Sequence, residues 1–252
     1  MGVQVEQLMG TAIGVDIRDP VVPDGIVERV FDHLRAVEAR FSTFRPDSEV
    51  SRLARGELLE ADCSPELRHV LAACDTLAVT SHGAFDARHQ PVVGGLDPSA
   101  YVKGWAVEEA AWILDDTGLH DYVINAGGDV IARGHASPGR PWRVGIRHPE
   151  ETHRVAAVLE VSDRAVATSG TYERGHHITD PRSGRSATAL RSLTVIGPGL
   201  AYADAYATAA FVMGLDGLGW VAAHPDHEAL AITIDGRLVR TAGVDRYLAS
   251  AA

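Results

Sequence analysis

The sequence has 252 residues, of which 46% are hydrophobic and 23% are charged, as in a globular protein rather than a disordered or fibrous one. Its 23 Lys and Arg against 34 Asp and Glu give a net charge of −11, which opposes binding to nucleic acids and to acidic membrane surfaces. Charged residues or glycines interrupt every apolar run before the ~18 residues that a membrane span requires, so we expect no such span.

The N-terminus and the cysteines predict a cytoplasmic protein. The opening MGVQVEQLMG has no basic segment, and Glu6 stands where a signal peptide would be apolar. Two cysteines, Cys63 and Cys74, are too few for a disulfide framework, and we expect both to be unlinked thiols in a reducing compartment.

The first half of the chain is predicted to be mainly helical after a strand-like segment at residues 3–19. Apolar residues then recur every three or four positions, and Ser64-Pro65 is a typical helix start. Asp24 is positioned to cap the first helix. These patterns predict helices over residues 27–41, 65–82 and about 104–117, with loops at 42–48 and 90–100.

The second half alternates with period two, which is typical of strands. Strands are expected at 122–125, 130–133, 142–147, 155–161, 165–168 and 193–196, followed by a helix at 201–213 and a hairpin of 229–234 and 238–241 around Asp235-Gly236. Because helices come mostly first and strands mostly later, the pattern predicts an α+β fold, with a mostly antiparallel sheet flanked by helices. No linker or repeat interrupts residues 1–252, so one domain is expected.

The usual nucleotide signatures, G-x-G-x-x-G after a strand and the P-loop, are absent from the sequence. A glycine-rich stretch, Asn125–Asp129, lies between two predicted strands instead. It has two interpretations: a hairpin turn, which is the commoner outcome, or a set of backbone amides that binds an anion.

A second polar stretch, His176–Gly184, contains an Asp180-Pro181 turn that Gly184 closes. His177, three residues before Asp180, could act as general base or acid with the carboxylate orienting it. The alternative is a surface turn with incidental histidines, in a chain that has 12 of them.

The predicted helix 201–213 is almost entirely small and apolar, yet it carries Asp204 and Thr208. At positions i and i+4 the two side chains lie on one face, and a carboxylate with a hydroxyl suits Mg²⁺ that holds a diphosphate. The competing interpretation has Asp204 as an acid at the helix start and Thr208 bonded to its own helix.

Two further stretches are candidates for ligand contact. Lys103 stands near a predicted helix N-terminus, where the dipole disfavours a cation, which indicates that it faces an anion. Phe85, in Gly83–Asp86, could stack on a flat ring, although a core position is the safer interpretation.

Together, these stretches resemble the ApbE family, the FAD:protein FMN transferases. The resemblance runs in order along the chain from about residue 8 to 245. The matching motifs are Met9–Thr11, Phe41–Glu49, Gly83–Asp86, Asp97–Gly104, Asn125–Asp129, Trp142–Ile146, Thr168–Arg174, His177–Gly184 and Asp204–Thr208.

The resemblance implies an α+β protein that binds FAD as a substrate, with Mg²⁺ on the diphosphate, and transfers FMN to a Thr or Ser hydroxyl of an acceptor protein while AMP leaves. By their positions in the motifs, Asp204, Thr208 and the carbonyl of Ala100 would be the metal ligands. His177 would be the catalytic residue, with Asp180 beside it. The residues that would contact FAD are Met9, Phe44, Ala84, Phe85, Asp86, Asp97 and Lys103.

The sequence departs from the family pattern at several of these positions. Pro98-Ser99-Ala100 replaces a common Leu-Gly-Gly, Val102 a usual Ala, Phe44 a common Tyr and Thr171 a frequent Asp. Many relatives carry a lipoprotein leader that is not found here, so the acceptor is expected to be reachable from the cytoplasm. Two other functions are compatible with the same residues: hydrolysis of FAD to FMN and AMP, and binding of FAD without chemistry.

Overall fold

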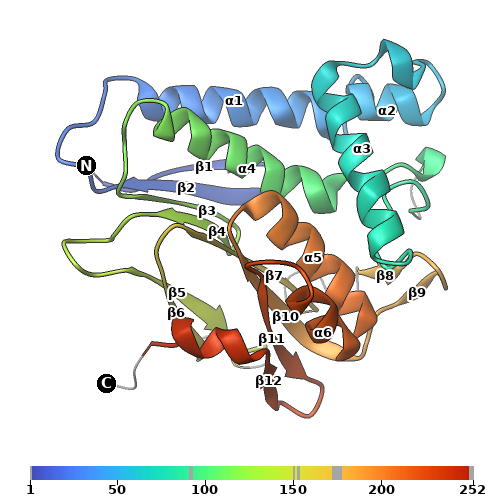
Figure 1. Ribbon diagram of the computed structural model, residues 1–252. Helices are drawn as coiled ribbons and strands as arrows, with labels where there is room; N and C mark the ends of the chain where they lie inside the picture. The colour runs from blue at the N-terminus through green and yellow to red at the C-terminus, as the bar shows by residue number, and fades with distance from the viewer. Residues whose placement is uncertain (1, 91–92, 150, 152–153, 172–177, 250–252) are drawn as a thin grey trace.

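One large antiparallel sheet forms the centre of the protein (Figure 1). The computed structural model describes residues 2–90, 93–149, 151, 154–171 and 178–249. The sheet has eight strands in the order β1-β2-β3-β4-β7-β10-β11-β12. Their bounds are Gln4–Leu8 (β1), Thr11–Ile17 (β2), Tyr122–Ala126 (β3), Asp129–Arg133 (β4), Arg164–Gly170 (β7), Leu190–Gly197 (β10), Glu228–Thr233 (β11) and Leu238–Arg240 (β12).

Helices cover one face of this sheet, with α4 between α1 and α5 (Figure 1). The helices are α1 (Ile26–Phe41), α2 (Glu49–Ala54), α3 (Pro65–Thr80), α4 (Ser99–Asp115), α5 (Leu200–Met213) and α6 (Asp216–Ala222). Helix α5 packs directly on β7 and β10, which places its side chains over the centre of the sheet.

The other face is covered in part by a two-stranded sheet, β5 (Trp142–Arg147) with β6 (Val155–Val161), and by the 3-10 helix η3 (Ala242–Tyr247). The central strands therefore alternate between two cores: in β7, Ala165 and Ala167 pack toward the helices, whereas Val166 packs toward Trp142 on the far side. A further short pair, β8 (Thr179–Asp180) with β9 (Arg185–Ser186), lies beside the main sheet.

The predicted α+β class with a mostly antiparallel sheet is confirmed, with differences in detail. The strand-like segment 3–19 is a hairpin whose turn is Met9-Gly10, both with positive φ. Helix α1 starts after Gly25, not after a capping Asp24, and Gly25 makes no side-chain cap. Helices α2 and α6 were not expected, because each is too short to show a helical period.

The third predicted helix begins earlier than expected. Helix α4 starts at Ser99 rather than near Gly104, because the Pro98 carbonyl accepts from the Tyr101 and Val102 amides and the Asp97 side chain accepts from the Ser99 amide, 2.9 Å away. The prolines and glycines of residues 90–100 predict one loop, but its last two residues belong to the helix. Lys103 is therefore the fifth helical residue and lies one turn inside α4.

Helices α4 and α5 cross with almost no space between them at Gly104. A Cβ built on Gly104 would lie 2.4 Å from the Leu200 carbonyl oxygen and 2.9 Å from Cβ of Asp204. Only glycine permits this approach, because the Leu200 obstacle is backbone and cannot rotate away. The contact sets Lys103, next to Gly104, against the face of α5 that carries Asp204.

Both cysteines are buried free thiols, as predicted. Burial raises the pKa of the Cys74 thiol to about 12 and also raises that of Cys63. We expect neither thiol of the native protein to react with Ellman's reagent at pH 8, and both to react in denaturant. Rapid reaction in the native state would contradict this packing.

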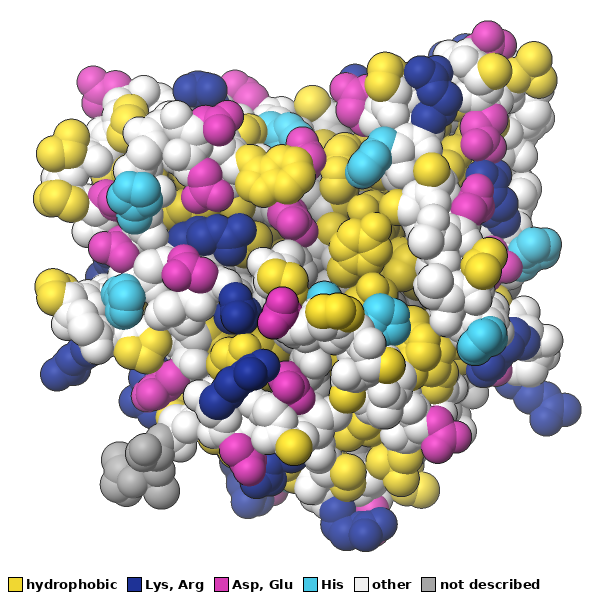
Figure 2. Space-filling view, in the orientation of Figure 1, with side chains coloured by type: hydrophobic (Ala, Val, Ile, Leu, Met, Phe, Trp, Pro, Cys, Tyr) yellow, Lys and Arg dark blue, Asp and Glu magenta, His cyan; other side chains and the backbone are white. Residues whose placement is uncertain are grey.

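Among the described residues, no helix combines the length and the apolar character needed to cross a membrane. Acidic and basic side chains are mixed over the face of the molecule shown in Figure 2, without a large area of one charge.

Candidate functional site

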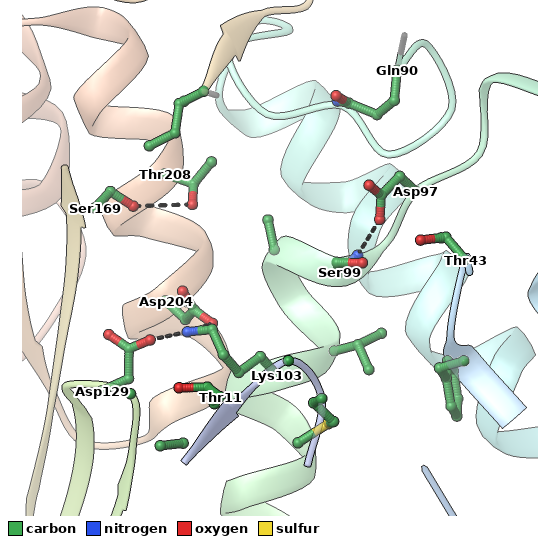
Figure 3. A pocket seen from close by; sticks show the side chains of 18 of the residues that line it. Thr11, Thr43, Gln90, Asp97, Ser99, Lys103, Asp129, Ser169, Asp204 and Thr208 are labelled. Carbon is green, nitrogen blue, oxygen red and sulfur yellow. Dashed lines mark hydrogen bonds and ion pairs between the residues drawn. The ribbon is translucent and has the colours of Figure 1, made fainter. Parts of the chain in front are cut away.

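A cavity of about 420 Å³ opens where the ends of several elements meet, a size typical of small-molecule sites. Its walls come from the β1–β2 turn, the end of α1, residues 84–86, the start of α4, the β3–β4 turn, the end of β7, and α5 (Figure 3). Every residue predicted to contact FAD and all three predicted metal ligands line this one cavity: Met9, Phe44, Ala84, Phe85, Asp86, Asp97, Ala100, Lys103, Asp204 and Thr208.

Met9 enters the cavity from the tight β1–β2 turn. Its φ of 51° is in the left-handed region, which costs a non-glycine residue about 1–2 kcal/mol. The amide of Met9 donates to Oε1 of Glu38 on α1, 2.7 Å away, and Glu38 also lines the cavity. Glu38 thus holds the turn, a role that the sequence did not reveal.

The two phenylalanines of the cavity differ in exposure. Phe44 is 93% exposed and lies in the α1–α2 connection, three residues after the end of α1, so its ring is available to a ligand. Phe85 is 3% exposed and packs in the main core, which confirms the core interpretation of this residue.

Asp86 and Asp97 are the carboxylates on the α3 and α4 side of the cavity. Asp86 accepts from the Arg88 amide and lies 2.7 Å from Nδ1 of His89. Asp97 uses Oδ1 to accept from the Ser99 amide at the start of α4. Both side chains therefore have positions fixed by local hydrogen bonds.

A charged group occupies the deep end of the cavity (Figure 3). The Lys103 ammonium donates to Oδ2 of Asp129 and lies 2.9 Å from Oδ2 of Asp204. Each carboxylate belongs to a residue that is only 5% exposed. The single Lys103 ammonium thus pairs with two buried carboxylates, so the three side chains together carry a net charge of about −1.

The residues around Asp204 are suited to a divalent cation. Oδ2 of Asp204 is buried and accepts no hydrogen bond from the described residues, although the Lys103 ammonium is close by. Thr208 lies one turn further along α5, and Ala100 is in the first turn of α4. A carboxylate, a hydroxyl and a backbone carbonyl are all hard oxygen donors of the kind that Mg²⁺ prefers, so the residues fit the predicted metal.

Thr208 has a partner that positions its hydroxyl. Its Oγ1 lies 3.2 Å from Oγ of Ser169 on β7, within hydrogen-bond range. The described residues contain no group of three or more His, Cys, Asp or Glu placed to bind a metal ion. Any cation here would therefore depend on hydroxyl, carbonyl and ligand oxygens together with Asp204.

The glycine-rich stretch 125–129 is a hairpin turn, the commoner of its two interpretations. The Gly127 amide donates to the Ala12 carbonyl at 3.0 Å, and the Gly128 amide donates to Oδ1 of Asn125 at 2.9 Å. Both amides are therefore already bonded and do not form an anion site. Ala126 and Gly127 line the cavity, and the charged group that this stretch contributes is Asp129, directly after the turn.

Asp180 stands apart from the other predicted residues. It is not among the residues that line the cavity, although its neighbours Thr179 and Pro181 are. Asp180 pairs with Arg182 through two hydrogen bonds, of 2.8 and 3.0 Å, and the Arg182 guanidinium holds the pKa of this carboxyl below its usual range. Residues 172–177 lie outside the described residues, and with them His177.

The sequence pointed toward Asp129 and Ser169 without identifying their roles. Asp129 ends the glycine-rich stretch 125–129, and Ser169 lies in the matching motif Thr168–Arg174, but neither motif assigns a role to these side chains. Lys103 is the residue from which this network could have been predicted, because a cation near a helix N-terminus is expected to face an anion. The anions it faces are the protein's own Asp129 and Asp204.

Comparison with curated proteins identifies relatives named FAD:protein FMN transferase. The protein of Rhodobacter capsulatus is 41% identical over 156 aligned positions, covering 58% of this chain and 29% of that protein. The protein of Haemophilus influenzae is 26% identical over 283 aligned positions, covering 84% of this chain and 82% of that protein. The chain thus spans less than a third of the Rhodobacter protein, and 37% of the Klebsiella pneumoniae relative, which is 32% identical.

Solved structures share the fold over nearly the whole chain. The flavin transferase ApbE from Vibrio cholerae superimposes with a TM-score of 0.86 at 24% identity, covering 98% of this chain and 99% of that one. The ApbE protein of Thermotoga maritima superimposes with a TM-score of 0.85 at 23% identity, covering 99% of this chain and 99% of that one. The ApbE family model matches residues 9–95 and 94–231, and the chain therefore belongs to the ApbE family.

Proposed function

We propose that this protein is an Mg²⁺-dependent FAD:protein FMN transferase that moves FMN from FAD to a Thr or Ser hydroxyl of an acceptor protein. The observation that carries the proposal is the meeting of all the predicted FAD contacts and metal ligands in one cavity, around the half-buried Lys103 and the buried Asp129 and Asp204. Membership of the ApbE family supports the same activity.

The proposed binding residues would recognise FAD in two ways, by charge at its diphosphate and by stacking on one of its flat rings. Lys103 would face the pyrophosphate of FAD, and the exposed ring of Phe44 would stack on a flat ring of the ligand. Asp204, Thr208 and the Ala100 carbonyl would hold Mg²⁺. When bound, Mg²⁺ neutralises the diphosphate and the charge that develops on the leaving phosphate.

The transfer step forms one bond and breaks one. The acceptor hydroxyl oxygen bonds to the phosphorus of the FMN half, and the bond from that phosphorus to the oxygen bridging to AMP breaks, so that AMP leaves with the bridging oxygen. The hydroxyl proton must be removed, and His177 is the proposed base. Asp180, kept ionised by Arg182, is the proposed carboxylate beside it.

A direct assay tests the activity. The purified protein is incubated with FAD, Mg²⁺ and a panel of candidate acceptors, and covalent flavin is followed as a fluorescent band on a denaturing gel. We expect a band that requires Mg²⁺, with AMP released in equal amount. AMP formed without any acceptor would indicate hydrolysis instead, and retained FAD with no AMP would indicate a binding protein without chemistry.

Phe44 provides a test of the binding mode. Because its ring is almost fully exposed, Phe44→Ala should leave the melting temperature unchanged. It should raise the Kd for FAD about 10-fold, the effect of losing one aromatic stacking partner. Phe44→Tyr is the matched control and should bind FAD as wild type does; the measurement is quenching of flavin fluorescence. An unchanged Kd for Phe44→Ala would show that the Phe44 ring does not contact FAD.

A further inference from the structure

The Asp204 carboxylate, which would bind the metal ion, already forms an ion pair with Lys103. Oδ2 of Asp204 lies 2.9 Å from the Lys103 ammonium, and the same buried oxygen makes no hydrogen bond within the part of the chain that the structure describes. A divalent cation on Asp204 would therefore lie close to a second positive charge. Like charges repel strongly at such a short distance, especially where burial reduces screening.

Asp129 gives Lys103 a second place to bind. The ammonium donates a hydrogen bond to Oδ2 of Asp129, whereas its contact with Asp204 lacks hydrogen-bond geometry. The ion pairs that the two carboxylates make with described residues are both with Lys103. The hydrogen-bonded contact of the two is thus the one to Asp129, the carboxylate that the predicted metal does not use.

Asp129 is held rigidly for this role. It is the first residue of β4, and its other oxygen, Oδ1, accepts from the Thr168 amide on β7 at 2.9 Å. Lys103 comes from α4 and Asp204 from α5, two helices fixed at contact by Gly104. The three side chains therefore reach one point from three separately anchored elements, as Figure 3 shows.

We propose that Asp129 is a positioning residue that retains the Lys103 ammonium when a divalent cation binds Asp204. This inference rests on the proposed function, since it takes Asp204 as a metal ligand. Without Asp129, Lys103 has Asp204 as its one remaining carboxylate partner among its described ion pairs and competes with the metal for it. With Asp129, the ammonium stays beside the site, where it can face the pyrophosphate of FAD.

The test measures metal affinity alone, without FAD or turnover. Binding of Mn²⁺, a hard cation with similar ligand preferences, is followed by the electron paramagnetic resonance signal of the free ion. Asp129→Asn keeps the acceptor for the Thr168 amide and removes the charge that holds Lys103. We expect it to weaken Mn²⁺ binding about 10- to 100-fold, as for other residues that orient metal ligands.

A double-mutant cycle separates positioning from simple loss of charge. In a Lys103→Met background there is no ammonium to retain, so Asp129→Asn should change the Mn²⁺ affinity less than about threefold. Lys103→Met alone should bind Mn²⁺ at least as tightly as wild type. Asp16→Asn is the matched control: Asp16 is also a buried carboxylate, paired with Arg18, but it does not line the cavity, and its loss should leave the affinity unchanged.

The outcomes are distinguishable. Equal weakening by Asp129→Asn in both backgrounds would mean that Asp129 acts through its charge alone and would overturn the inference. If Asp129→Asn does not fold, as thermal unfolding would reveal, Lys103→Met decides: weaker Mn²⁺ binding than wild type overturns the proposal, and equal or tighter binding supports it. Absence of Mn²⁺ binding to wild type would overturn the metal part of the proposed function itself, and this inference with it.

Discussion

Replacing Asp204 with Asn is expected to lower FMN transfer roughly 100- to 1000-fold at saturating FAD, the scale of losing a group that stabilises transition-state charge. Asp204 is the carboxylate in the proposed metal-ligand set, and its buried Oδ2 accepts no hydrogen bond from any residue whose position is described. The amide keeps the shape of the side chain but has no charge to hold Mg²⁺. The measurement is the rate of covalent flavin formation as a function of Mg²⁺ concentration.

Asp216→Asn is the matched control for this variant. Asp216 lies in the first turn of the next helix, α6, carries the same charge and is exposed, so its loss should leave the rate unchanged. Thr208→Ala should reduce the rate less, because a neutral ligand contributes less to charge neutralisation. Wild-type activity in Asp204→Asn at every Mg²⁺ concentration would refute the metal role of this residue.

The second large effect is expected at Gly104. Gly104→Ala places a methyl group 2.4 Å from a backbone oxygen of α5, and neither helix can yield without moving the other. Overpacking of this kind lowers the free energy of unfolding by about 1–3 kcal/mol. The same displacement would separate Lys103 from Asp204, so FAD binding should weaken as well. Urea denaturation and flavin fluorescence measure the two effects.

Gly219→Ala distinguishes a steric cause from a helix-propensity effect. Gly219 is also helical, but a Cβ there meets nothing within 4 Å. Alanine at an open helical position stabilises by roughly 0.5–1 kcal/mol relative to glycine. If Gly104→Ala also stabilised the protein, the α4–α5 contact would not be as close as described.

The elements that the sequence predicted well are those with a long, one-sided apolar pattern. Helix α1 is the clearest case: a stripe from Val27 to Phe41 could be recognised because only one face is buried. The start of α4 was misplaced because six of the seven residues from Tyr101 to Val107 are buried, so this part of the helix has no one-sided periodic pattern to mark its beginning. The break between β1 and β2 was missed because Met9, which has a positive φ, is not a typical turn residue.

The site was predicted in so far as its residues lie in recognisable motifs. Asp204 and Thr208 could be placed on one face of a helix from their spacing alone. The network that joins them to the sheet could not, because Asp129 and Ser169 reach Lys103 and Thr208 only through the three-dimensional packing of β4 and β7 on the helices. Such pairings depend on strand order, which a single sequence does not contain.

The cavity has a consequence for the order of events during synthesis of the chain. Its walls include Met9, near the start of the sequence, and Thr208, on the last helix to contribute to it. A nascent chain can complete these walls only after α5 has left the ribosome and packed against strands made much earlier. A dinucleotide could therefore bind there only in the final stage of folding. The loss of chain entropy on bringing such distant segments together comes before the stabilising contacts between them form.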